Sequence, residues 1–276
     1  GLVAAVIRRM YGSDDLFPDS LMDACHPYQS VNYINSHDGF TLYDQVAYNR
    51  RHNWPNGEQN RDGHLDNNSW NCGWEGDEDV PDEVMDLRIR QAKNFFCLLM
   101  LSNGTPMLRA GDEFLQTQQG NNNPYNQDNV VSWLDWERLD AFSDFHRFAR
   151  RMIAFRKAHP TIARSRFWRD DVRWYGTGPE VHWSEDSSHF AWFLSGRSQH
   201  DVDLYVMVNA EQTDRTFEIQ ERPEQLWELV IDTSRASPED VADPGAESPL
   251  TEPTYHVHSH SVVVLKSGSL ARSTSE

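Results

Sequence analysis

Apolar residues in the first 160 positions recur with the spacing of amphipathic helices. Residues three and four positions apart share one face of a helix, so this spacing predicts three helices. They are expected at residues 2–11, from residue 82 to the Asn103-Gly104 pair, and around residues 145–155, ending before Pro160. The middle helix has the widest apolar stripe, which predicts that it packs against a sheet.

Two short runs between these helices have the pattern of β-strands. They are residues 30–36 (SVNYINS) and 106–110 (PMLRA), and each is followed by a polar group. Strands that alternate with helices predict parallel α/β units up to residue 159. Residues 49–81 and 120–129 are rich in Asn and Gly and show no period, so we predict two long loops.

The pattern changes after Pro160. Short apolar or alternating runs follow one another there, separated by Gly, Pro, Asp and Ser, and this spacing predicts an antiparallel β-sandwich in a second domain, residues 160–276. The expected strands are residues 172–175, 181–183, 190–194, 204–209, 216–219, 226–232, 255–257 and 262–265. Residues 236–253, rich in Pro, Asp, Glu and Ser, are expected to form a flexible loop within it.

Charge and cysteine content restrict the partners and the compartment. The formal net charge is -18, from 43 acidic and 25 basic residues, which disfavours nucleic acid and anionic lipid as partners. The start of the chain lacks the charge order of a signal peptide, and no stretch has the apolar length of a membrane span. Three scattered cysteines are typical of a reducing compartment. We therefore expect a cytoplasmic protein. A chain that begins with Gly fits a piece of a longer one, and it equally fits removal of an initiating Met.

The dipeptide His37-Asp38 stands where the first predicted strand ends. In β/α barrels the catalytic groups lie at the C-terminal ends of the strands, so this position suits chemistry. The alternative is structural, with Asp38 capping the helix that follows.

Four motifs in order then resemble one family. Residues 31–44 (VNYINSHDGFTLYD) and 104–113 (GTPMLRAGDE) are similar to the motifs at barrel strands seven and eight of the α-amylase superfamily of glycoside hydrolases. Residues 120–129 (GNNNPYNQDN) with 133–136 (WLDW) resemble its isoamylase and glycogen-debranching branch. Residues 156–160 (RKAHP) resemble the point where the last barrel helix meets a C-terminal sandwich.

This resemblance implies a fold and an activity. The fold is the last part of a (β/α)8 TIM barrel, residues 1–159, followed by the β-sandwich. The activity is hydrolysis of α-1,6 branch linkages in glycogen or a related branched α-glucan, with no cofactor. Asp38 would be the carboxylate that stabilises the transition state, and His37 would bind the same sugar ring. Hydrogen bonds to ring hydroxyls that tighten in an oxocarbenium-like state contribute several kcal/mol to such catalysis.

The other two catalytic carboxylates of the family are missing. The family's nucleophile stands in a Gly-Phe-Arg-x-Asp motif, which the 276 residues do not contain. The resemblance therefore implies that the nucleophile and the general acid lie upstream, and that this chain needs the upstream part of its own protein and is inactive alone.

Further substrate contacts are expected from the long loops. Trp54, Trp70 and Trp74 lie among Asn and Asp residues, a composition that suits stacking on sugar faces, although inward-packed Trp anchors in an ordinary loop explain it equally well. We include Trp54, together with Asn123 and Tyr125 of the Asn-rich segment, as candidate substrate-binding residues. Asp112 could bind substrate or fix its loop, and we favour a structural role for Glu113.

The sequence predicts no dedicated metal site. Asp62, Asp66 and residues 77–79 lack the spacing of a calcium-binding loop. His256, His258 and His260 alternate, which would align three imidazoles on one face of a strand, but no acidic ligand stands in a motif with them. We interpret them as surface residues, with incidental metal binding left open.

Two other functions compete with hydrolysis of branch points. The chain could be a carbohydrate-binding module that uses the Trp-rich loop and the sandwich without catalysis. Alternatively, the same superfamily fold could act on another α-glucan linkage or transfer a glycosyl group to a sugar acceptor.

Overall fold

The computed structural model describes residues 2–18, 25–184, 187–221 and 226–268. The chain divides into two compact units. The unit that we call the sandwich unit comprises Gly1–Val31, Met100–Thr105 and Ile153–Glu276. The other, the loop unit, comprises Asn32–Leu99 and Pro106–Met152. No helix in the described part of the chain has the length and apolarity to cross a membrane.

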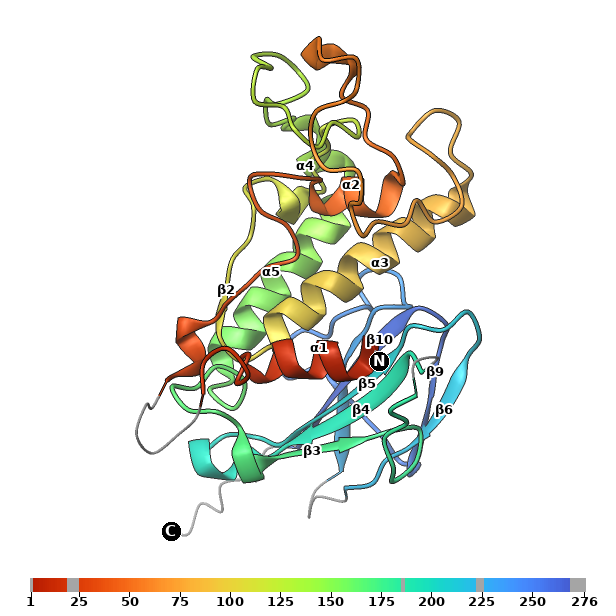
Figure 1. Cartoon of the computed structure of the whole chain (residues 1–276). Coiled ribbons are helices and arrows are strands. Elements are labelled where there is room, and N and C mark those ends of the chain that lie inside the picture. The colour runs from red at the N-terminus through yellow and green to blue at the C-terminus, as the bar shows by residue number, and fades with distance from the viewer. Residues whose placement is uncertain (1, 19–24, 185–186, 222–225, 269–276) are drawn as a thin grey trace. The chain divides into compact units, whose positions relative to one another are not determined.

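The three predicted helices are present. They are α1 (Leu2–Tyr11), α3 (Asp82–Leu101) and α5 (Ser143–Ala158), joined by two short helices, α2 (Leu42–Ala47) and α4 (Glu137–Ala141) (Figure 1). The predicted apolar stripes are the buried faces. In the loop unit Phe96 of α3 and Phe145 of α5 are each 1% exposed, and their rings meet edge to face at 6.1 Å. Such an edge-to-face contact stabilises the packing of the two helices beyond the effect of the apolar area that they bury.

The two strands predicted in the first half are much shorter than expected. Among the described residues of the first half, the strands are β1 (Val31–Asn32) and β2 (Thr105–Pro106), which form a two-stranded sheet. Thr105 N donates to Ser30 O at 2.9 Å and Met107 N to Asn32 O at 2.8 Å, so both segments run in the same direction. The prediction of strand beyond residue 32 was wrong, because the backbone oxygen of Ile34 accepts instead from the Gln45 side chain.

The second half contains the predicted antiparallel sheets, which form the sandwich (Figure 1). The large sheet has the order β3-β4-β5-β10-β7-β8, and β6 and β9 form a small sheet. The strands are β3 (Val172–Tyr175), β4 (His189–Leu194), β5 (Leu204–Asn209), β6 (Arg215–Glu218), β7 (Trp227–Asp232), β8 (Ser248–Pro249), β9 (Thr254–Val257) and β10 (Ser261–Ser267).

Side chains from both sheets share one core. Phe217 of β6 and Val257 of β9 pack in the same cluster as Tyr205, Met207 and Val263 of the large sheet. Each of these five residues is 0% exposed. Burial of this kind on both inner faces is what holds a sandwich together. The predicted strand at 181–183 does not form, and the predicted loop 236–253 includes the short strand β8.

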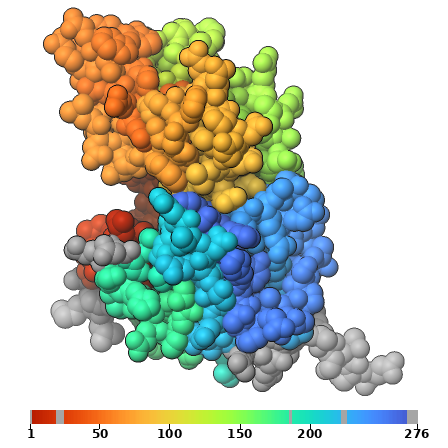
Figure 2. Space-filling view, turned by 90° about the vertical axis from the view of Figure 1, so that its right-hand side faces the viewer, coloured from red at the N-terminus to blue at the C-terminus, as the bar shows by residue number. Residues whose placement is uncertain are grey.

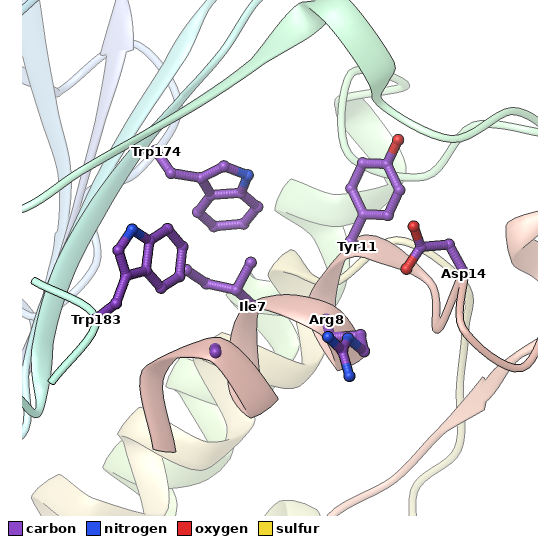
Figure 3. A pocket seen from close by; sticks show the side chains of 7 residues that line it. Ile7, Arg8, Tyr11, Asp14, Trp174 and Trp183 are labelled. Atoms are coloured by element: carbon purple, nitrogen blue, oxygen red, sulfur yellow. The ribbon is translucent and has the colours of Figure 1, made fainter. Parts of the chain in front are cut away.

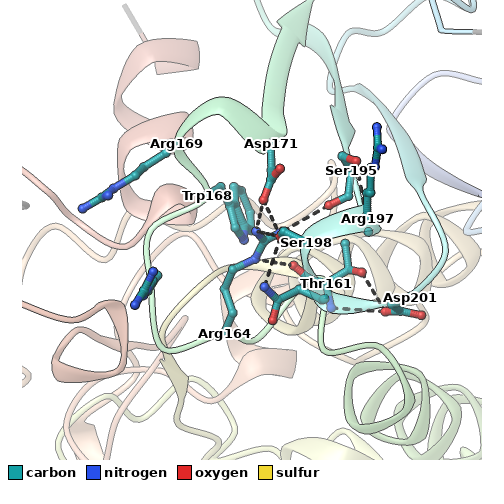
Figure 4. Close-up of polar contacts among 12 residues, drawn as sticks. Thr161, Arg164, Trp168, Arg169, Asp171, Ser195, Arg197, Ser198 and Asp201 are labelled. Carbon is teal, nitrogen blue, oxygen red and sulfur yellow. Dashed lines mark hydrogen bonds and ion pairs between the residues drawn. The ribbon is translucent and has the colours of Figure 1, made fainter.

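A buried arginine organises the turn into the sandwich (Figure 4). The Arg164 guanidinium pairs with Asp171 and donates to Ser198 Oγ at 3.1 Å, and Thr161 donates to Asp201 Oδ2 at 2.7 Å. Burial opposes ionisation of Asp201, but hydrogen bonds from His159 and Thr161 outweigh it and lower the pKa of Asp201 to about 2. His159 of the RKAHP segment is thus bonded to Asp201, shortly before β5, and Arg164 is paired with Asp171, immediately before β3.

The compact units do not follow the expected division at residue 159. α1 groups with the sandwich residues, because Tyr11 stacks on Phe167 at 5.4 Å and meets Trp168 edge to face at 6.2 Å. The division into a barrel part, 1–159, and a sandwich domain, 160–276, stays a prediction.

Candidate active site

The His37-Asp38 pair lies on an exposed loop between β1 and α2, in the loop unit. The side chains of His37 and Asp38 are 92% and 72% exposed, and His37 Nε2 lies 3.5 Å from Asp38 Oδ2. The N-cap of α2 is Thr41, whose hydroxyl accepts from Asp44 N at 3.0 Å. The alternative in which Asp38 caps this helix is therefore wrong, because Thr41 is the capping residue.

Asp112 fixes the two ends of that loop. Its Oδ1 accepts from Asn35 Nδ2 at 3.1 Å and from Leu42 N at 3.0 Å, so one oxygen ties the residues before and after His37-Asp38. Asp112 is 1% exposed. Burial raises the pKa of Asp112 to about 6, although both hydrogen bonds and the charge of Arg109 act against the rise. Asp112 acts here through the loop that it positions, and direct substrate binding by it stays a prediction.

A second buried acid that the sequence analysis missed supports the same region. Asp44 of α2 is 0% exposed and accepts from the Thr117 hydroxyl and, at 2.9 Å, from Gln118 N. Burial raises its pKa to about 6. Gln118 in turn donates to Gly39 O at 3.3 Å and to Asn121 O at 2.9 Å, so it links the His37-Asp38 loop to the Asn-rich segment.

The Asn-rich segment is a structural connection as well as a candidate surface. Asn122 N and Asn53 Oδ1 are 3.0 Å apart, and Asn53 Nδ2 donates back to Asn122 Oδ1 at 2.8 Å. Asn56 and Asn121 exchange side-chain hydrogen bonds in the same way. These four asparagines are 0–5% exposed, so their buried amides take hydrogen-bond partners from one another. The long loop 49–81 and the segment 120–129 are thereby held together.

The candidate residues on these two segments differ in exposure. Trp54 and Tyr125 are 66% and 67% exposed, whereas Asn123 is half-buried and donates to Asp62 Oδ2 at 3.0 Å. The amide of Asn123 is thus already engaged within the loop. Trp54 and Tyr125 are the most exposed aromatic side chains of the two segments, and Trp70 and Trp74 of loop 49–81 are also exposed, at 39% and 38%. The residues of loop 49–81, orange in the space-filling view, form part of the surface of the loop unit (Figure 2).

Arg88 of α3 holds another part of the Trp-rich loop 49–81 by hydrogen bonds. The buried Arg88 side chain donates to Asp77 Oδ1 at 3.1 Å, to Ala47 O at 3.2 Å and to Trp74 O. Glu75 accepts from Asn49 N at 2.8 Å and Arg50 N at 3.0 Å. The sequence gives no signal for the contacts of Arg88, because their partners lie 11 to 41 positions away.

Two acids of the long loop, Asp62 and Asp77, have hydrogen-bond partners within the protein. Asp62 accepts from Asn56 and Asn123, and Asp77 pairs with Arg88 and Tyr43. The histidine alternation also differs from the expectation, because β9 ends at Val257 and only His256 lies within it. Among the described residues the group with metal-ligand geometry is Asp214 with His256 and His258.

A separate pocket lies in the sandwich unit. It has a volume of about 300 Å³ and is lined by Ala4, Ile7, Arg8, Tyr11, Asp14, Trp174 and Trp183. Trp174 and Trp183 stand on one side of the space, and Tyr11 and Asp14 stand on the other (Figure 3). Aromatic faces with charged groups beside them suit a sugar, which is apolar on its faces and polar at its rim.

Comparisons with known proteins agree on one family. The family described as isoamylase 1-3, C-terminal, matches residues 173–267. Rice isoamylase 3, chloroplastic, is 39% identical over 96% of this chain and 33% of its own length. The glycogen operon protein GlgX homolog of Mycobacterium tuberculosis is 39% identical over 82% of this chain and 30% of its own. The chain thus spans about a third of the length of the curated relatives that it matches.

Solved structures agree on the fold. A pullulanase from Anoxybacillus sp. LM18-11, solved with maltotetraose, superposes with a TM-score of 0.65 at 21% identity, over 96% of this chain and 30% of that one. The neighbours are pullulanases of the α-amylase family, and antiparallel sheets form the C-terminal region here. The chain belongs to the isoamylase and glycogen-debranching branch of the α-amylase superfamily and carries the C-terminal domain of that branch.

Proposed function

We propose that this chain is part of an enzyme that hydrolyses α-1,6 branch linkages in glycogen or a related α-glucan. The observation that carries the proposal is the 39% identity to an isoamylase over 96% of the chain. Because the chain spans about a third of that relative, the activity belongs to a longer protein that contains it.

Asp38 is the carboxylate that stabilises the transition state in this proposal. Its exposure lets it accept hydroxyl hydrogen bonds from a sugar ring, and a carboxylate makes such bonds charge-assisted. The hydrogen bonds of Asp112 to Asn35 and Leu42, on either side of His37-Asp38, support this role, since a catalytic group must be held in place by buried neighbours. His37, on the same loop, binds the same ring.

The nucleophile and the general acid lie upstream of the chain in this proposal. A retaining mechanism needs two carboxyl groups about 5 Å apart, and the sequence lacks the family's nucleophile motif. β1 and β2 are then the last two strands of the barrel. Their common direction and the loops that follow them support this assignment, because barrel strands are parallel and carry their active sites on such loops.

The proposed substrate is a neutral polysaccharide, which is compatible with the net charge of -18. Hydrolysis through carboxyl groups needs no cofactor. The cysteines Cys25, Cys72 and Cys97 are free thiols, which supports a reducing compartment such as the cytoplasm.

A second candidate function is glucan binding without catalysis, and the Trp174–Trp183 pocket favours it. Trp183 is 55% exposed, so a sugar ring has access to its face. Glucan binding at this pocket also suits a hydrolase, so binding alone does not separate the two candidate functions. They differ in what the full-length protein does to a branch point.

A linkage assay tests the proposed function. The full-length protein is expected to release reducing ends from branched glucan and few from linear maltodextrin, whereas the 276-residue chain alone releases none because two carboxyl groups are missing. Cleavage of linear maltodextrin at the same rate would contradict debranching. Binding of maltotetraose that depends on Trp183, without any hydrolysis by the full-length protein, would instead support the binding function.

A further inference from the structure

Three metal-ligating side chains meet at the edge of the small sheet. Asp214 precedes β6, His256 lies in β9, and His258 follows that strand. Asp214 Oδ2 lies 3.1 Å from His256 Nε2 and 3.0 Å from His258 Nδ1. The three ligand atoms all lie within 4.8 Å of one another.

These separations suit a single ion. Nitrogen and carboxylate ligands bind zinc at about 2.0–2.1 Å, and tetrahedral geometry then places neighbouring ligand atoms roughly 3.3 Å apart. The two distances to Asp214 Oδ2 are within a few tenths of an ångström of that value. The two imidazole nitrogens are at most 4.8 Å apart, a separation that rotation of these exposed side chains can adjust to one ion.

Neighbouring groups hold these ligands in place. The other carboxylate oxygen, Asp214 Oδ1, accepts from Ser259 N at 2.8 Å, and the Thr216 hydroxyl lies 3.5 Å from His256 Nδ1. Such contacts to the atoms of a ligand that do not touch the ion orient it. The adjacent cation, Arg215, pairs with Glu211, so it leaves Asp214 to the imidazoles.

We propose that Asp214, His256 and His258 bind a divalent first-row transition-metal ion such as Zn²⁺. Two imidazoles and one carboxylate suit such ions, with water in the remaining positions. Each imidazole must present a lone pair, so its proton on that nitrogen moves to the other ring nitrogen or to solvent. The side chains are 56%, 54% and 42% exposed, for His256, His258 and Asp214, and an ion reaches them directly from solution.

The bound ion has a structural consequence. It links the residue before β6 to the end of β9, which pair as Arg215 with Val257 and Thr216 with His256. The unfolded chain does not bring these side chains together. The ion therefore binds the folded form preferentially and stabilises it by mass action.

Calorimetric titration with ZnCl₂ tests the proposal on protein without a histidine tag, stripped of metal by a chelator that is then removed. One equivalent of Zn²⁺ is expected to bind and to raise the midpoint of thermal unfolding. Loss of a supporting contact around a metal typically weakens binding roughly 10–100-fold, so loss of a ligand in His256→Ala or Asp214→Asn should weaken it by about 100-fold.

Two controls make the result decisive. His64→Ala, an exposed histidine of the loop unit, is expected to bind Zn²⁺ as the wild type does. Mg²⁺ is expected not to bind, since it prefers oxygen ligands. Absence of Zn²⁺ binding, or binding that His256→Ala and Asp214→Asn leave unchanged, would overturn the proposal. Asp214→Asn preserves the size of the side chain, so the test does not depend on a large change in packing.

Discussion

At the scale of single residues, the candidate site combines exposed side chains with buried ones that hold them. His37 and Asp38 are exposed, whereas Asp112, which bonds to residues before and after them, is 1% exposed. The motif indicated the exposed pair because its residues are adjacent in the sequence. The hydrogen bonds of Asp112 to Asn35 and Leu42 were not predictable, since these residues are 77 and 70 positions away and only the folded chain brings them together.

The raised pKa of Asp112 predicts a pH dependence of stability. Burial raises it from 3.8 to about 6, so between these values the folded state binds a proton that the unfolded state has lost. Its contribution to stability is therefore present below about pH 4 and is lost as the pH rises through about 6. In Asp112→Asn, which cannot ionise, we expect stability relative to the wild type to be greater at pH 7 than at pH 4.5.

Urea unfolding of both proteins at the two pH values measures this difference. Asp140→Asn, at an exposed acid of α4, controls for the change from acid to amide. The same difference in unfolding free energy between wild type and Asp112→Asn at both pH values would contradict the assignment.

At the scale of elements, the helices were predictable and the early strands were not. The stripe that includes Phe96 lies in one helix, so its period is a local property. A strand needs a neighbouring strand, and residues 33–36 pair with none. The backbone oxygen of Ile34 accepts from the Gln45 side chain, and the Asn35 amide donates to Asp112. The sandwich strands were predicted within one or two residues, because short apolar or alternating runs between turn residues are a local signal too. The run at 181–183 has this pattern but forms no strand.

We expect substitution of Arg156 in α5 to destabilise the C-terminal end of α3 strongly. Its guanidinium donates to the backbone oxygens of Met100, Ser102 and Gly104, each at 2.6 Å, and the residue is 8% exposed. Arg156→Ala leaves these acceptors without their donor and should lower the free energy of unfolding by about 3 kcal/mol or more.

Lys157→Ala is the matched control, because Lys157 is the exposed neighbour in the same helix. Its effect should stay within about 0.5 kcal/mol. Chemical denaturation of both variants provides the comparison. Equal losses of stability in the two variants would show that the three hydrogen bonds do not stabilise the end of α3.

At the scale of the whole molecule, family and fold agree, and the proposed function assigns the chemistry to a longer protein that contains this chain. The four motifs indicated the isoamylase branch, and homology over 96% of the chain bears this out. The sequence could not reveal how the compact units divide, because contacts of α1 with Phe167 and Trp168 join residues more than 150 positions apart. The central claim concerns one carboxylate on one loop, and it can be tested in the full-length protein.

The most direct test is the turnover of Asp38→Asn on branched glucan, beside Asp140→Asn as the control. Asp38→Asn keeps the shape of the side chain but removes the charge that strengthens its bonds to the sugar hydroxyls, so we expect kcat to fall by roughly 10²-fold or more with an unchanged thermal unfolding midpoint. Asp140→Asn should retain wild-type turnover. Near-normal turnover of Asp38→Asn would contradict the assignment of Asp38 as the stabilising carboxylate.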